Sequence, residues 1–349
     1  GYDQRVATGV ISASGTLAQI IPPSLVLIIM ADQLGRSVGD MYQGALIPGL
    51  VLTCMYFGYV ALVAIFKPAY VPALPPEART LRGVKLFVRV LTTLLPPLML
   101  IFLVLGTIFL GVATPTEGGA MGAFGALAMA VLRKRLSWAL LKQAMESTAK
   151  LTTFVVMILV GARVFSLTFY GVEGHLWVEH LLSNLPGGRI GFLVAVNLLI
   201  FFLAFFLDYF ELSFIVVPLL APVAEKLGID LIWFGVLLGV NMQTSFMHPP
   251  FGFALFYLRS VAPPSVKTSQ IYWGAVPFVL IQIIMVALII TFPQLVTMGL
   301  ETQEKIDTDK VEIIVPDSAP SDDEAIQFDS PTPEEAAKAL DKSAPDDKK

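Results

Sequence analysis

The stretch from Ser14 to Met30, SGTLAQIIPPSLVLIIM, places the strongest constraint on the fold, because it is apolar enough for a lipid bilayer yet contains Pro22 and Pro23. Each proline removes a backbone donor and clashes with the preceding helical turn. In hydrocarbon the freed carbonyls cannot bond to water, so such a break survives only where protein, a cavity or a bound ion satisfies them. We therefore expect a discontinuous helix with polar partners at its break.

The composition indicates an integral membrane protein. Hydrophobic residues make up 56% of the 349 residues and charged residues 14%, whereas soluble domains average about 25% charged residues. The net charge of −4 is unevenly distributed, because residues 301–349 hold 15 of the 27 acidic and 6 of the 23 basic side chains. The remaining body is therefore positive. We expect membrane lipid around it and no nucleic-acid partner.

Several sequence features limit the possible functions. The chain begins GYDQR, without Met or an apolar leader, which predicts a start inside a longer protein. The only cysteine, Cys54, excludes intrachain disulfides and is interpreted as an apolar packing residue. The motifs HExxH, GxSxG and GxxxxGK[ST] are missing, so the sequence favours neither an enzyme nor ATP hydrolysis by this chain.

Apolar runs of about 20 residues or half that length divide the chain into four parts. Residues 1–66 hold the broken helix and a span. Residues 67–95 place Arg79, Arg82, Lys85 and Arg89 at helical spacing beside apolar residues, which predicts an interfacial amphipathic helix at about 77–95. Residues 96–298 hold further spans, including a re-entrant hairpin at about 189–224, a broken helix at about 231–260 and a last span at 275–298. Residues 299–349 form an acidic tail whose composition predicts disorder.

Two segments of the chain repeat each other. IIPPSLVLIIM, followed by SV and YQGALIPG, matches MHPPFGFALFY, followed by SV and YWGAVPF, at offsets of 227 to 230 residues. Basic residues precede the first break and follow the second, which predicts opposite orientations by the positive-inside rule. The sequence therefore predicts the inverted repeats of a secondary transporter.

Neutral oxygen ligands gather at both breaks. Hydroxyl, amide and unwound carbonyl oxygens are hard ligands that suit an alkali cation. The alternative is that Ser and Thr side chains only bond to carbonyls of their own helix. The candidate ion ligands at the breaks are Ser14, Gly15, Thr16, Pro22, Asn241, Thr244 and Ser245, with Ser12, Ser24, Gln243 and His248 beside them.

Carboxylates at membrane depth are functional candidates by default. Asp208 and Glu211 lie in the middle of the predicted hairpin, three residues apart, and would share a face on a helical backbone. We interpret Asp208 as an ion ligand and Glu211 as a substrate ligand; the alternative is solvation in a water-filled vestibule. Glu117 follows Thr114-Pro115-Thr116 at a helix start, where a capping role is at least as well supported as a transport role.

The remaining substrate candidates are Ser24, His248 and Arg163. Arg163 is a lone cation within a spanning run, so it must pair with an acid, a carbonyl or an anionic substrate, or else extend to the interface. His248 could titrate but lacks other histidines nearby with which to bind a metal. No metal other than Na⁺ is expected.

Five separated motifs resemble the large membrane subunit of tripartite ATP-independent periplasmic (TRAP) transporters, the DctM-like permeases. They cover about residues 1–298 in the order of that family: GYDQRVATGVISASGTLAQIIPPS, SVGDMYQGALIPG, GVATPTEGGAMGA, PLLAPVAEKLGIDLIWFGV and NMQTSFMHPPFGFALF. The resemblance implies an elevator-type transporter of the ion-transporter superfamily, driven by a Na⁺ gradient. It further implies organic acids delivered by a periplasmic binding protein, and a small membrane subunit as partner.

At the corresponding positions, the resemblance implies a Na⁺-binding loop at residues 14–23. It implies the second, symmetry-related loop at residues 241–250. The LDYFE tip around Asp208 matches the second re-entrant hairpin of the family. The first hairpin of the family precedes the GYD motif and has no counterpart here, so we expect one ion site to be incomplete. FFLDYFE and HPP also depart from the more usual family patterns and leave the substrate open.

The function predicted from the sequence is therefore a multi-pass permease subunit of a Na⁺-coupled symporter in a bacterial inner membrane. Its substrate would be an organic acid of the dicarboxylate or keto-acid type. No cofactor other than the coupling ion is expected. The alternative is a channel-like or structural membrane subunit without its own ion coupling.

Overall fold

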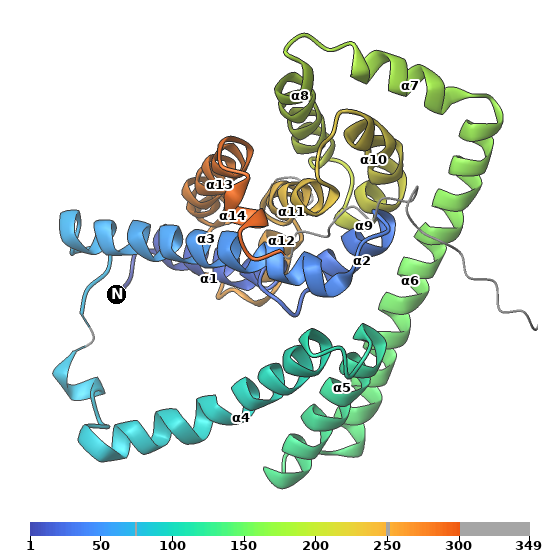
Figure 1. Ribbon diagram of the computed structural model, residues 1–349. Coiled ribbons are helices and arrows are strands. Elements are labelled where there is room, and N and C mark those ends of the chain that lie inside the picture. Colours follow the sequence, from blue (N-terminus) through green and yellow to red (C-terminus); the bar gives the residue numbers. More distant parts are fainter. Residues whose placement is uncertain (74, 249–251, 301–349) are drawn as a thin grey trace, which may run out of the picture. The chain divides into compact units, whose positions relative to one another are not determined.

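The computed structural model describes residues 1–73, 75–248 and 252–300, and all regular secondary structure in these residues is helical (Figure 1). Residues 1–300 form one compact unit. The predicted acidic tail lies outside the described residues from position 301 onward. In the described part, four helices are long and apolar enough to cross a membrane: α3 (Val38–Phe66), α4 (Gly83–Phe109), α6 (Trp138–Gly171) and α13 (Thr268–Thr291). The prediction of an all-α polytopic membrane protein is confirmed.

The first predicted broken helix is present as α1 (Gln4–Leu17) and α2 (Leu25–Gln33). Asp3 caps the start of α1, where its carboxylate accepts the backbone N–H groups of Arg5 and Val6. Residues 18–24 interrupt the helix around Pro22-Pro23, and Ser24 then caps α2 by accepting the N–H of Leu27. The proline pair thus ends one helix and a serine begins the next.

The second broken helix consists of α11 (Leu231–Met242), the 3₁₀ turn η3 (Gln243–Met247) and α12 (Phe253–Val261). Asp230 caps α11 through the N–H of Trp233 at 2.8 Å. Almost every side chain of α11 is buried, unlike those of α1 and α12. Pro249 and Pro250, which the sequence places in this break, lie outside the described residues.

Each broken helix packs against the other copy of the repeat, because α1 contacts α12 and α13 while α11 contacts α2 and α3. At Gly274 of α13, a Cβ would lie 2.2 Å from the carbonyl oxygen of Arg5 in α1. At the matching Gly44 of α3, a Cβ would lie 3.1 Å from Cγ2 of Ile232 in α11. Arg5 and Ile232 are themselves 227 positions apart, so the same contact occurs twice. This reciprocal packing of the two repeats supports the duplication. The opposite membrane orientations stay a prediction.

The last span differs from its predicted bounds of 275–298. The helix α13 begins at Thr268, where the Lys267 backbone N–H donates to the Gln270 side-chain oxygen, and ends at Thr291 because Phe292 precedes Pro293. A short helix, α14 (Gln294–Thr297), follows and contacts α3. The interpretation of Cys54 as a packing residue is wrong, because it lies on an exposed side of α3.

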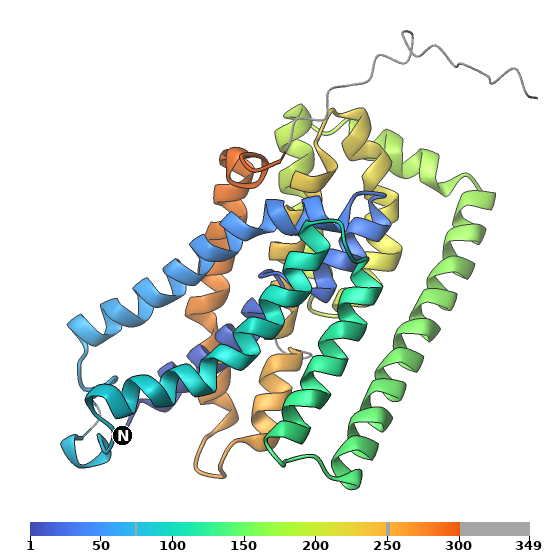
Figure 2. The same ribbon diagram turned by 60° about the horizontal axis from the view of Figure 1, so that its bottom comes forward.

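The segment between the repeats also differs from prediction. After the 3₁₀ turn η1 (Pro76–Ala78), α4 runs without interruption from Gly83 to Phe109 through Pro96 and Pro97, so no boundary separates an interfacial helix from a span at 95. The helix α5 (Pro115–Leu132) lies beside α4 after a short turn (Figure 2). No side chain of α4 is buried. Placement of residues 83–95 in the interface stays a prediction.

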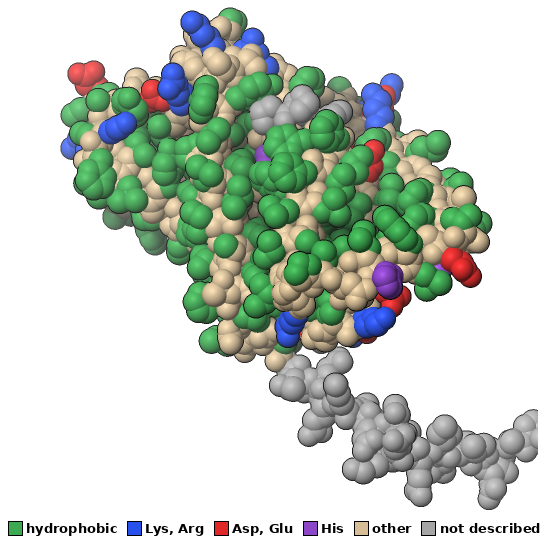
Figure 3. Space-filling model, turned by 90° about the horizontal axis from the view of Figure 1, so that it is seen from above, with side chains coloured by type: hydrophobic (Ala, Val, Ile, Leu, Met, Phe, Trp, Pro, Cys, Tyr) green, Lys and Arg blue, Asp and Glu red, His purple; other side chains and the backbone are tan. Residues whose placement is uncertain are grey.

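The predicted hairpin appears as α8 (Gly188–Leu203) and α10 (Val217–Lys226), joined by the short helix α9 (Tyr209–Glu211) and the π-helical turn η2 (Leu212–Val216). The helix α7 (Gly174–Ser183) connects it to α6. The tip elements α9 and η2 contact α6, and η2 also contacts α2. In Figure 3 the visible face is covered mostly by hydrophobic side chains, with charged ones near its edges, as a bilayer requires.

Candidate functional site

The first break has a buried and an exposed side. Ser12, Thr16 and Ser24 are buried, and so is Pro22. Ser14 and Gly15 are exposed, and the Ser14 hydroxyl donates to the Val10 carbonyl of its own helix. The alternative of local bonding is therefore confirmed for Ser14, and only part of the predicted ligand set shares the buried side.

Thr16 and Ser24 mark the two ends of the first break. The Thr16 hydroxyl donates to the Ala13 carbonyl at 2.9 Å, and the Ser24 hydroxyl donates to the carbonyl of Gln19. Tyr42 of α3 donates to the Ser24 carbonyl at 3.4 Å. The polar groups of this break are thus partly satisfied from within the helix and from the neighbouring span.

The described residues of the second break are buried, apart from the half-buried Phe246. Asn241, Thr244, Ser245 and His248 are all buried, and Thr244 donates to the Asn241 carbonyl at 2.6 Å. The Asn241 amide donates to the Asn197 carbonyl at 2.8 Å and to the Asn197 side-chain oxygen at 3.0 Å. These bonds fix the start of the break against α8. A cavity of about 270 Å³ adjoins both asparagines and is otherwise apolar.

Asn197 was missed by sequence reasoning. Its signal was a single amide within the apolar run at 189–207, which must find a buried partner in a membrane. The sequence could not identify that partner, because Asn241 lies 44 positions away.

The two breaks meet at matching positions of the repeat. The Gln243 side-chain amide donates to the Thr16 hydroxyl at 3.5 Å, and these residues are 227 positions apart. The Gln243 side-chain oxygen and the Ser12 hydroxyl are buried without a hydrogen-bond partner in the described part of the chain. Buried oxygen atoms without a partner are costly unless a ligand or water satisfies them. These neutral oxygens suit a weakly held alkali cation.

At the hairpin tip, Asp208 and Glu211 bond to each other's backbone. Asp208 accepts the N–H of Glu211 at 3.0 Å, and Glu211 accepts the N–H of Asp208 at 3.1 Å, which is a capping box. The prediction of a shared helical face is wrong, because Asp208 has an extended backbone and precedes the helix. Both residues are half-buried rather than freely solvated.

The hairpin contacts both breaks. The Tyr209 hydroxyl donates to the Val26 carbonyl in α2 at 2.5 Å, just after the first break. His248 of the second break packs against Phe201 and Phe205, with ring centroids 4.6 and 4.4 Å apart. Neither ring nitrogen of His248 has a partner in the part that the structure describes. The hairpin therefore covers a buried imidazole that could still donate or accept a hydrogen bond.

Two other candidates lie elsewhere. Arg163 is exposed on α6 and forms no ion pair among the described residues, so the structure does not bring it to either break. Glu117 forms a capping box with Thr114 at the start of α5, which confirms its predicted capping role. Gly118 and Gly122 of α5 pack closely against side chains of α4.

Comparisons with known proteins all indicate the same family. Residues 1–295 match the family model described as "Tripartite ATP-independent periplasmic transporter, DctM component". The chain is 29% identical over 302 residues to the sialic acid TRAP transporter permease protein SiaT of Haemophilus influenzae, covering 85% of this chain and 47% of that protein. It is 30% identical over 310 residues to the C4-dicarboxylate TRAP transporter large permease protein DctM of Vibrio cholerae, covering 81% and 66% respectively.

A third relative is named for another substrate. The chain is 27% identical over 303 residues to the 2,3-diketo-L-gulonate TRAP transporter large permease protein YiaN of Escherichia coli, covering 86% of this chain and 69% of that protein. The chain thus spans about half to two thirds of the length of these relatives.

Proposed function

The chain belongs to the family of DctM components of tripartite ATP-independent periplasmic transporters, and on this premise we propose that it forms part of a Na⁺-coupled organic-acid importer. The observation that carries the proposal is the meeting of the two breaks through Thr16 and Gln243, with buried oxygens of Gln243 and Ser12 left without partners. In this proposal the coupling ion is held near the breaks by neutral oxygens. A secondary transporter needs ligands of this kind, because the ion must also leave.

The substrate class rests on the relatives. SiaT, DctM and YiaN are named for sialic acid, C4-dicarboxylate and 2,3-diketo-L-gulonate, which are all organic acids. We propose an organic acid that reaches the space between the breaks and the hairpin tip. There His248 offers unpartnered ring nitrogens, whereas the buried Ser24 hydroxyl already donates to the Gln19 carbonyl and caps α2. Arg163 is not part of this proposed site.

The proposed partners follow from the tripartite family. They are a small membrane subunit and a periplasmic binding protein, and the proposed location is a bacterial inner membrane. Asp208 and Glu211 are proposed to shape the hairpin tip, because each caps the other's backbone. Their remaining carboxylate oxygen atoms stay free to approach an ion.

The test is uptake of a labelled C4-dicarboxylate or sialic acid into proteoliposomes that hold the complete transporter with its small subunit and binding protein. Outside Na⁺ is compared with outside K⁺ for wild type, Thr16→Ala and Ser14→Ala. Both variants remove one hydroxyl from the same break, but one is buried and the other exposed. Loss of one hydrogen-bonding oxygen, worth about 1.4 kcal/mol, should raise the half-saturating Na⁺ concentration about tenfold in Thr16→Ala only.

Each other outcome decides against part of the proposal. Uptake that is equal in Na⁺ and K⁺ would refute ion coupling and favour a channel-like or structural subunit. Na⁺-dependent uptake with equal responses of Thr16→Ala and Ser14→Ala would keep coupling but remove the ion from the buried side of the break.

A further inference from the structure

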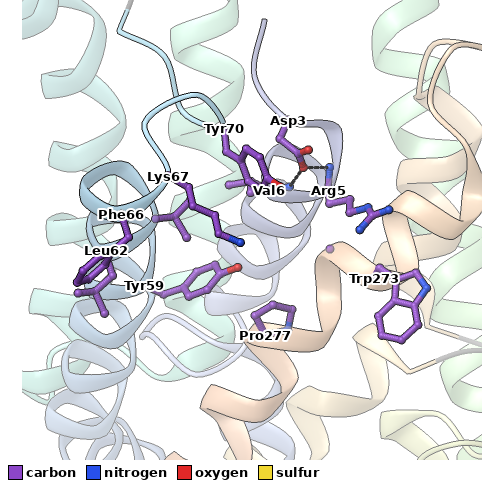
Figure 4. Close-up of a pocket in the computed structure, with 12 residues that line it drawn as sticks. Asp3, Arg5, Val6, Tyr59, Leu62, Phe66, Lys67, Tyr70, Trp273 and Pro277 are labelled. Atoms are coloured by element: carbon purple, nitrogen blue, oxygen red, sulfur yellow. Dashed lines mark hydrogen bonds between the residues drawn. The ribbon is translucent and has the colours of Figure 1, made fainter.

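A cavity of about 460 Å³ opens at the ends of three helices, apart from both breaks (Figure 4). The start of α1 forms one side, the end of α3 another and the first turns of α13 the third. Its lining residues include Asp3, Arg5, Tyr59, Phe66, Lys67 and Trp273. The transport site described above uses none of them.

The charge of this cavity is set by Arg5 and Lys67. Neither cation forms an ion pair among the described residues. Among the described residues, Asp3 is the only carboxylate that lines the cavity, and it accepts the N–H groups of Arg5 and Val6 at 2.9 and 3.2 Å. Figure 4 shows Lys67 extending toward the middle of the cavity and Arg5 extending toward α13. The cavity therefore holds two cations and one carboxylate, which leaves a net positive charge for an anion.

The walls of the cavity are apolar and aromatic. Leu62 and Phe66 belong to the last turns of α3, and Trp273 lies on α13 with 65% of its surface exposed. The Lys67 ammonium lies 5.2 Å from the ring centroid of Tyr70. Trp and Tyr beside Lys and Arg at the end of a spanning helix are typical of the membrane interface. A ligand with an anionic head and an apolar body would match both parts.

We propose that this cavity binds the phosphate headgroup of an anionic phospholipid, with its acyl chains along Leu62 and Phe66. Basic pockets between spanning helices recognise lipid headgroups in this way. The distribution of Arg and Lys predicts that this end faces the cytoplasm, where anionic lipids attract basic residues. The lipid bridges α1 and α13, which carry Arg5 and Trp273, to the end of α3 at Lys67.

The first test measures lipid retention on the complete transporter in detergent by native mass spectrometry. Phosphatidylglycerol is compared with phosphatidylcholine as probe, for wild type and for the double variant Arg5→Gln/Lys67→Gln. Each cation near a membrane surface contributes roughly a fivefold preference, so we expect phosphatidylglycerol binding to weaken about thirtyfold in the double variant. Binding of phosphatidylcholine should change little.

The matched control is Arg135→Gln/Lys150→Gln, which removes one arginine and one lysine outside the cavity. Both residues are exposed and carry the same charge as Arg5 and Lys67, but they do not line the cavity. The control should retain phosphatidylglycerol as wild type does. Equal loss in both double variants would mean general attraction to basic surface and would overturn the site.

A second test detects lipid in the cavity by fluorescence quenching and does not depend on lipid retention in detergent. Phosphatidylglycerol with brominated acyl chains should quench the fluorescence of wild type more than that of Trp273→Phe, because Trp273 lines the cavity. Inorganic phosphate should not reverse this quenching. Reversal by millimolar phosphate would indicate a soluble-anion site, and quenching that is unchanged in Trp273→Phe would exclude a lipid here.

Discussion

The two breaks have nearly the same sequence pattern but different surroundings. At the first, Ser14 and Gly15 face outward and only the side of Ser12 and Thr16 is buried. At the second, every candidate from Asn241 to His248 is buried except Phe246, which is half-buried. The second break is held by α8 through Asn197, whereas the first is held by tyrosines of α3 and α9. Within this chain, the described residues of the second break are thus more completely buried than those of the first.

This difference shows that residues at matching positions of the two repeats need not play the same role. Thr16 and Gln243 occupy matching positions and touch, yet one offers a hydroxyl and the other an amide. The matching contacts at Gly44 and Gly274 differ as well. Gly44 faces side chains that can shift, whereas Gly274 faces the backbone of α1.

The largest effect is expected for Gly274→Ala. Its Cβ would lie 2.2 Å from the Arg5 carbonyl oxygen, so α1 must move away from α13. We expect a loss of about 3 kcal/mol, near the upper end for overpacked cores. The measurement is the thermal denaturation midpoint in detergent micelles.

Gly44→Ala at the matching position and Gly15→Ala are the controls. A Cβ at Gly44 would meet side-chain atoms at 3.0 and 3.1 Å, and one at Gly15 would meet nothing within 4 Å. We expect a loss of about 1 kcal/mol for Gly44→Ala. Gly15→Ala should not destabilise, because alanine favours helix. Equal denaturation midpoints for Gly274→Ala and Gly44→Ala would show that the two repeats do not differ in packing at this position.

An intermediate effect is expected for Asn241→Ala. The change leaves the side-chain oxygen and carbonyl of Asn197 without their donor, which costs about 1–3 kcal/mol for a buried group. Thermal denaturation of Asn241→Ala and of Asn197→Ala/Asn241→Ala provides the check. If the two asparagines act as a pair, the double variant should be no less stable than Asn241→Ala, whereas additive losses would argue against the pairing.

The smallest effect is expected for an ion pair at the base of the hairpin, away from both breaks. Lys226 donates to Glu179 at 2.6 Å, and this bond lowers the pKa of Glu179 below its usual value of 4.5. Because the folded-state pKa is the lower one, the stabilisation is present above about pH 4.5 and is lost as the pH falls through the folded value.

Glu179→Gln should therefore lower the denaturation midpoint slightly at pH 7 and not at pH 3. It should also leave the Na⁺ dependence of uptake unchanged. A shifted Na⁺ dependence in this variant would show that the base of the hairpin, and not only its tip, influences the proposed ion site.

Much of the helix order could be predicted because its causes are local. Pro22-Pro23 removes two backbone donors at the first break, and Thr114 with Glu117 caps α5 within four residues. The bounds of α4 were harder to predict, because the change from a basic amphipathic stretch to an apolar run suggested a boundary at residue 95 that α4 does not have. Its apolar and basic stretches join in one helix of 27 residues.

The site was only partly predictable, because tertiary packing decides which side of a helix faces the protein core. In a membrane both lipid and protein neighbours are apolar, so hydropathy does not reveal which side of a helix faces the core. The sequence therefore grouped Ser14 with Thr16, although neighbouring helices bury only Thr16. The same limit hid Asn197 as the partner of Asn241 and left Arg163 among the substrate ligands.

The sequence by itself determined that this is a membrane protein with a duplicated broken helix and the motifs of its family, because hydropathy, prolines and caps act within short stretches of chain. Only the tertiary structure decided that Thr16 meets Gln243, that Asn241 bonds to Asn197, and that Arg5 and Lys67 share a cavity. These pairs are far apart in sequence, and they form because α1 packs against η3 and α3 while α11 packs against α8.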